Sequence, residues 1–224
     1  MPLYIRHVNL SGSWMPAGRD WEPTRLPVGA ASQIRAYKIT SAPEGKHDLA
    51  LCAEFESIWR RNAATIVDLL RGDERSAFVW ASGPFLSDDL LVVLRYVDEW
   101  TKSGARYQVD NLTSWDGQPG YRTGRVTFEF RKDTFERMMA DESLDAEEIY
   151  LPVLLVPDRL ISGLPGRPLE AFGLQWLLEN EALALLPMGH FEGYVVLGSA
   201  NAVMDAVRRI THLVTGAPPG AVGA

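Results

Sequence analysis

The chain has 224 residues, of which 46% are hydrophobic and 23% are charged, values typical of a globular protein rather than of a disordered chain. A formal net charge of −7 disfavours binding to nucleic acid, and the longest apolar runs are far shorter than the roughly 20 residues of a membrane-spanning helix. We therefore expect one domain over residues 1–214 and a disordered tail over 215–224.

The single cysteine, Cys52, excludes an internal disulfide and fits a reducing compartment. The first residues lack the basic start, apolar stretch and cleavage site of a secretory signal. Together these features favour a cytoplasmic protein with no membrane association.

The first 46 residues contain two apolar alternations, at 3–8 and 34–39, which predict two short strands. The stretch between them is rich in Gly, Pro and Trp, and it includes Trp14 and Trp21. Such a loop must pack on something. It either covers the core of this protein or presents aromatic anchors to a partner.

A helix is predicted over residues 48–70, because apolar residues recur there every three or four positions and Gly72 ends the pattern. Cys52 falls on its apolar side and is expected in the core. A buried strand follows at 77–80. A further helix begins after Ser87 and ends before Gly104.

Residues 107–112 and 125–130 predict two strands, joined by an irregular loop that contains Trp115. Asp133 and Glu136 have the spacing of a capping box and predict a short helix with Phe135, Met138 and Met139 on its apolar side. A buried strand is expected over 149–156, where Pro152 implies a bulge or an edge position.

A helix over 169–178 precedes two apolar runs, 183–186 and 194–197, which flank a tight turn near His190 and predict a hairpin. Ser199 is placed to cap a last helix. The predicted fold class is α+β, with a mixed, largely antiparallel sheet and about five helices packed mostly on one face. A loose match between 124–136 and the chain 69 positions later raises the alternative of two ββα-containing halves.

The sequence offers no recognisable catalytic or metal-binding signature. No two of the four histidines have the spacing of a metal site on one element, and the phosphate-binding, dinucleotide-binding and nucleophile-elbow motifs are missing. We therefore predict no metal and no cofactor. His190 beside Glu192, together with His7, is the first candidate for a catalytic group if the protein is an enzyme.

An acidic stretch supplies the most specific functional indication. Residues 133–148 contain seven carboxylates and one basic residue, Arg137, so this face should attract a basic protein. Seven tryptophans, several of them in loops, add candidate interface anchors. The predicted partner-binding residues are Glu142, Asp145, Glu147, Glu148, Trp14, Trp21 and Trp115.

Three functions remain open on this basis. The first is a non-enzymatic protein-binding module, for instance an immunity or antitoxin-like inhibitor of a basic enzyme. The second is an enzyme with a loop-lined pocket near His190. The third is a structural subunit of a larger assembly. The sequence does not fix the oligomeric state.

Overall fold

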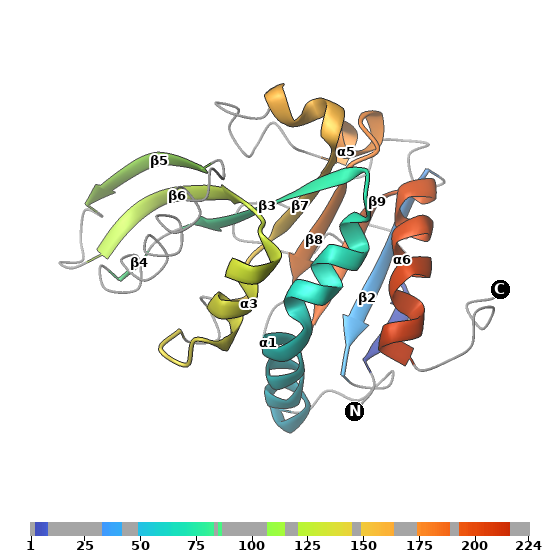
Figure 1. The fold of residues 1–224 in the computed structure, drawn as a ribbon, viewed down its shortest axis with the longest axis horizontal. Coiled ribbons are helices and arrows are strands. Elements are labelled where there is room, and N and C mark those ends of the chain that lie inside the picture. The colour runs from blue at the N-terminus through green and yellow to red at the C-terminus, as the bar shows by residue number, and fades with distance from the viewer. Residues whose placement is uncertain are drawn as a thin grey trace.

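An antiparallel sheet with helices on both faces forms the framework of the protein (Figure 1). The computed structural model describes residues 3–8, 33–41, 49–82, 85–86, 107–114, 121–144, 149–163, 174–188 and 193–215. The strands are β1 (Tyr4–His7), β2 (Ile34–Thr40), β3 (Arg75–Ser82), β4 (Phe85–Leu86), β5 (Tyr107–Ser114), β6 (Tyr121–Glu129), β7 (Val153–Pro157), β8 (Leu183–Pro187) and β9 (Tyr194–Ser199). The α-helices are α1 (Leu49–Arg71), α3 (Lys132–Ala140), α5 (Leu174–Glu179) and α6 (Ala200–Thr215), and η2 (Asp158–Gly163) is a 3-10 helix.

The strands follow the order β1-β2-β9-β8-β7-β3-β6, and both β4 and β5 pair with β6. Every pairing among the described strands is antiparallel, which confirms the α+β class and corrects the predicted mixed sheet. Hairpins such as β8–β9 pair antiparallel through a short connection, whereas a parallel pair needs a crossover. The described residues contain four α-helices instead of about five, and the helix predicted after Ser87 lies outside them.

Both faces of the central strands β7, β8 and β9 are buried, which explains why these strands are apolar at nearly every position. Leu185 and Val196 belong to the core that α1, α3 and α6 cover. Their neighbours Leu186 and Val195 belong to a second core, which α5 covers through Leu177. Three of the four described α-helices therefore lie on one face, called here the helix face. None of the described helices has the length and apolar character needed to cross a lipid bilayer.

The two hairpin-and-helix units, β5-β6-α3 and β8-β9-α6, are not equivalent copies. Val126 and Phe128 belong to the core on the helix face, whereas the residues matched to them, Val195 and Leu197, belong to the opposite core. A shift of one residue in register turns a strand's side chains to the other face. Both ββα-containing units are present, but their matched strand positions face opposite cores, so the loose sequence match is not a repeat of the structure.

The sequence led us to expect Pro152 in a bulge or at an edge of the sheet. The structure places it in neither position. β7 begins at the next residue, Val153, and it pairs with β8 on one side and β3 on the other. A proline has no N–H group to donate and is disfavoured inside a strand that pairs on both sides, and Pro152 lies just before β7.

The helix α3 begins at Lys132, one residue before the expected cap, and the predicted capping box is not formed. Its N-cap is Arg131, which makes no side-chain capping hydrogen bond. Asp133 lies in the first turn, where its charge complements the positive end of the helix. Burial of Phe135, Met138 and Met139 is confirmed.

The end of α1 is fixed by a residue of α6. Gly72 adopts a positive φ of 61° and donates its N–H to Asp68 O at 3.2 Å, as expected of a residue that ends a helix. Arg209 of α6 donates to the free carbonyls of Leu69 and Leu70, each at 2.7 Å. The guanidinium of Arg209 thus joins α6 to α1.

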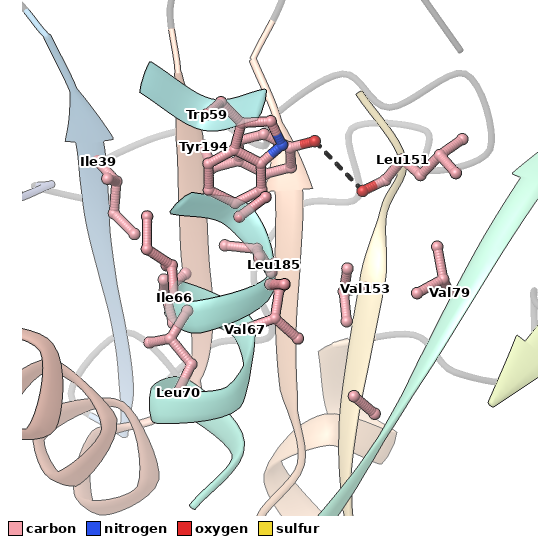
Figure 2. Close-up of a cluster of buried hydrophobic side chains, with 14 of the residues drawn as sticks. Ile39, Trp59, Ile66, Val67, Leu70, Val79, Leu151, Val153, Leu185 and Tyr194 are labelled. Carbon is pink, nitrogen blue, oxygen red and sulfur yellow. Dashed lines mark hydrogen bonds between the residues drawn. The ribbon is translucent and has the colours of Figure 1, made fainter. Parts of the chain in front are cut away.

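A cluster of stacked aromatic rings joins α1 to the sheet (Figure 2). The ring centroids of Trp59 and Tyr194 are 4.1 Å apart, and those of Tyr150 and Tyr194 are 5.3 Å apart. The Tyr194 hydroxyl donates to Leu151 O at 3.4 Å, whereas the buried indole N–H of Trp59 has no acceptor among the described residues. Such stacking adds to the free energy gained by burying the rings.

Burial in this cluster raises the pKa of Tyr194 well above its ordinary value, and burial likewise raises the pKa of Tyr150. Above about pH 10 the unfolded chain loses these phenolic protons while the folded chain keeps them, so stability should fall by about 1.4 kcal/mol per pH unit for each such group.

Tyr194→Phe should remove the contribution of one such group, so the stability of this variant should fall less steeply as the pH rises. Urea unfolding of both proteins between about pH 9 and pH 11 checks this. Identical slopes would contradict it.

Candidate functional site

A groove of about 710 Å³ lies between α1 and α3 on the helix face. Figure 1 shows the two helices side by side, with the C-terminal end of α3 next to the N-terminal half of α1. Called the α1–α3 groove below, it is lined by Ala53, Glu56, Ser57, Arg60, Arg61, Ala64, Glu136, Met139, Ala140 and Glu142. It brings ionisable side chains of both helices together.

The lining follows directly from helix periodicity. On α1 the apolar side, with Phe55 and Trp59, is buried against the sheet, so positions 53, 57, 60 and 64 form a neighbouring stripe that faces α3. On α3 the buried residues Met138 and Met139 anchor the helix, and Glu136 and Ala140 lie beside them at its surface. Small residues on both helices leave the space between them open.

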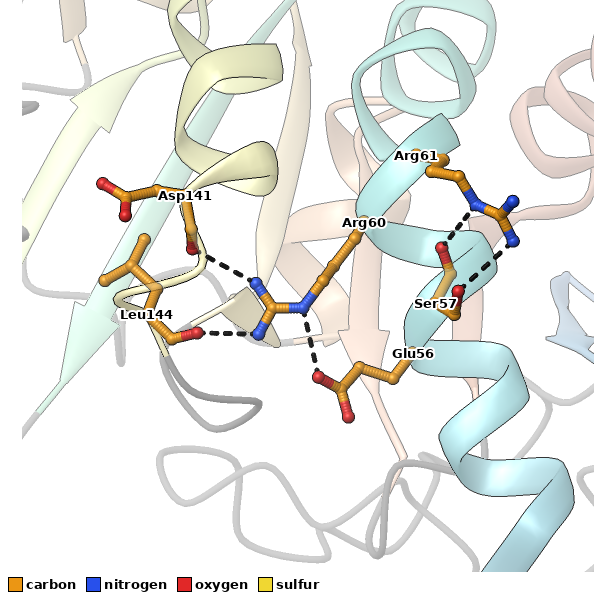
Figure 3. A network of polar contacts seen from close by, with 6 residues as sticks. All are labelled: Glu56, Ser57, Arg60, Arg61, Asp141 and Leu144. Atoms are coloured by element: carbon orange, nitrogen blue, oxygen red, sulfur yellow. Dashed lines mark hydrogen bonds and ion pairs between the residues drawn. The ribbon is translucent and has the colours of Figure 1, made fainter.

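Arg60 joins α1 to the turn that follows α3 (Figure 3). Its guanidinium donates to Glu56 Oε1 at 3.1 Å, to Leu144 O at 2.7 Å and, more weakly, to Asp141 O at 3.4 Å. Free carbonyls at a helix C-terminus carry negative partial charge, which a cation stabilises. Arg60 therefore binds groups of the protein itself, and these bonds hold the turn at 141–144 against α1.

The turn also carries its own bonds. The Asp141 carboxylate accepts hydrogen bonds from the backbone N–H of Ser143 at 2.9 Å and from its hydroxyl at 2.6 Å. Leu144 is buried, with 1% of its surface exposed, and its N–H donates to Asp141 O at 3.2 Å. These contacts fix the backbone on both sides of Glu142, and they therefore fix the position from which its side chain projects.

The charges that remain available in the groove are mainly negative. Glu136 and Glu142 are exposed, and neither forms an ion pair with another described residue. Arg61 is also exposed, and its guanidinium donates to Ser57 O at 3.0 Å and Ser57 Oγ at 3.2 Å, within its own helix (Figure 3). The α3 side of the groove is thus acidic, and the α1 side carries one basic group.

One of the predicted partner-binding residues, Glu142, lies in this groove. Asp145, Glu147, Glu148, Trp14, Trp21 and Trp115 lie outside the described residues, so their contribution remains a prediction. The sequence did not identify Arg60, Glu56 or Met139 as part of a site. The spacing of Glu56 and Arg60, four residues apart on a helix, was a usable signal for their ion pair.

The histidines and the cysteine form no site in the described part of the chain. His190 and Glu192 lie outside it, and His7 lies on β1, where its ring meets that of Tyr37 at 5.4 Å. Cys52 is buried on α1, which confirms the expectation that it belongs to the core. No group of three or more His, Cys, Asp or Glu side chains among the described residues could hold a metal ion.

Comparisons with protein families, with curated proteins and with solved structures find no match to this chain. The function must therefore be inferred from the geometry of the site itself.

Arg60→Met should lower the free energy of unfolding by about 2 kcal/mol, because two backbone carbonyls lose a charged donor and Glu56 loses its counterion. Amide hydrogen exchange at residues 141–144 should also speed up, since the turn is no longer held against α1. Urea unfolding and exchange measurements check both effects.

Arg61→Met is the matched control, because Arg61 contacts only Ser57 in the described structure. Its change in stability should stay within about 0.5 kcal/mol. Equal losses for the two variants would show that the bonds of Arg60 do not hold α3 in place.

Proposed function

We propose that this protein is a non-enzymatic binding module, which receives a basic segment of a partner protein in the α1–α3 groove. The observation that carries this proposal is the placement of Glu136 and Glu142 on one side of the α1–α3 groove while the nearby cation Arg60 is engaged by Glu56 and two carbonyls. The carboxylates of Glu136 and Glu142 therefore remain available to bind cationic groups of a partner.

The chemistry of the groove favours a protein partner. Ala53 and Ala140 add exposed apolar surface to its lining, next to the buried Ala64 and Met139. Apolar contact at the centre with charged groups at the rim is the usual arrangement of a protein interface. The net charge of −7 would add long-range attraction for a basic partner, which raises the association rate.

The groove is less suited to catalysis. Catalysis needs a nucleophile or base held close to a partner group in a site that excludes water. Glu136 and Glu142 are exposed, and among the described residues no histidine or cysteine lines the groove. An enzyme with a site near His190 and a structural subunit of a larger assembly stay alternative proposals, and inhibition of a basic enzyme would be one form of the binding function.

Reversal of charge at both carboxylates, Glu136→Lys with Glu142→Lys, tests the proposal. A partner captured on the immobilised full chain should associate about tenfold more slowly with this variant at low salt, and the salt dependence of its association rate should weaken. Surface plasmon resonance with the purified partner at several ionic strengths measures both.

The control variant, Glu74→Lys with Glu179→Lys, makes the same change in net charge at two exposed positions away from the groove. It should reduce the association rate far less. If both double variants associate equally slowly, only net charge matters and the groove is not the binding site.

A further inference from the structure

We infer that the partner segment bound in the α1–α3 groove is an amphipathic α-helix, which lies along α1 and α3 as a third helix. This inference rests on the proposed function and specifies the kind of partner. Its basis is the backbone of the groove walls, the length of the groove and the distribution of charge across it.

The backbone of the groove walls offers no strand edge to an extended ligand. A peptide in extended conformation binds mainly by pairing its main chain with an open strand edge. Both walls here are helices, whose N–H and C=O groups are bonded within the helix, and the carbonyls of Asp141 and Leu144, beyond the end of α3, already accept from Arg60. A helix satisfies its own backbone, so it can enter this groove without leaving buried polar groups unpaired.

The polar side chains on the α1 wall are also engaged. Ser57 Oγ accepts from Arg61, and the guanidinium of Arg60 makes three hydrogen bonds inside the protein. The α1 wall therefore offers few unbonded polar groups, and a ligand would meet this wall mainly by apolar contact. An apolar stripe on a helix provides such contact at i, i+3, i+4 and i+7.

The length and shape of the groove fit a short helix. The stripe from Ala53 to Ala64 covers about three turns of α1, or about 16 Å at 1.5 Å per residue. Small residues along it, Ala53 and Ser57 on α1 and Ala140 on α3, allow a third helix to approach closely. A ligand helix of about 12 residues would fill the groove.

The two sides of the groove differ in charge, which fixes the chemistry of the ligand. Glu136 and Glu142 lie on the α3 side, and Arg61 lies on the α1 side. The ligand helix should carry Lys or Arg along the edge that meets α3, with Ala, Leu or Met facing Ala53 and Ala140. Residues along the edge that meets Arg61 should be uncharged or acidic.

Two peptide libraries displayed on phage test this inference on the full chain. Both contain peptides of about 12 residues with the same Lys, Arg and apolar content, but one library has helix-forming residues throughout and the other has prolines at its centre. We expect binders from the helical library. Binders drawn equally from the proline library would overturn the inference.

A substitution that fills the groove supplies the second readout. Ala53 is exposed, so Ala53→Trp should leave the fold intact and weaken the selected helices at least about tenfold by occupying their space. Asn201→Trp, at an exposed position of α6, should leave their affinity unchanged. Selected helices that bind the wild type and Ala53→Trp equally would overturn the inference.

Failure of this inference differs from failure of the proposed function. If reversal of charge at Glu136 and Glu142 weakens the captured partner but Ala53→Trp does not, the groove binds a basic protein without a docked helix. If reversal of charge leaves the captured partner unaffected, the proposed function is wrong, and the inference is wrong with it.

Discussion

The rotation of α1 about its own axis is the constraint on which the rest of the site depends. Trp59 stacks on Tyr194 at 4.1 Å and fixes one side of the helix against the sheet. Successive helical residues differ in direction by about 100°, so this contact also fixes where Arg60 points. Arg60 can then reach the turn after α3 and hold it beside α1. The groove is the space that remains between two helices so placed.

Polar groups near the groove divide into those that hold the fold and those left for a ligand. Arg60, Glu56 and the Asp141 carboxylate all bond within the chain. Glu136 and Glu142 are exposed and pair with no other described residue. Glu56 neutralises Arg60 as an ion pair, and the exposed Glu136 and Glu142 outnumber Arg61, the one other cation in the groove lining, so the lining is net negative. This separation connects the packing of the helices to the proposed function.

Periodicity in the sequence predicted the elements better than their arrangement. The α1 stripe ending at Gly72 and the hairpin β8–β9 were predicted correctly, because burial of one face imposes a regular pattern. Strand order depends on contacts between distant segments and was not predictable in the same way. The error at Pro152 arose because a buried apolar run does not mark where hydrogen bonding begins. Local charge singled out Glu142, which lies in the α1–α3 groove, whereas the contacts of Arg60 depend on carbonyls more than 80 residues away.

The proposed binding function requires that the partner contact Ala53 and Ala140 in the α1–α3 groove. Methyl NMR of alanine-labelled protein tests it most directly, because Ala53 and Ala140 lie in the groove and Ala202 lies on α6. Addition of the purified partner should shift the methyl signals of Ala53 and Ala140 and leave that of Ala202 in place. A saturated complex in which Ala53 and Ala140 do not shift, while alanines elsewhere do, would contradict the account.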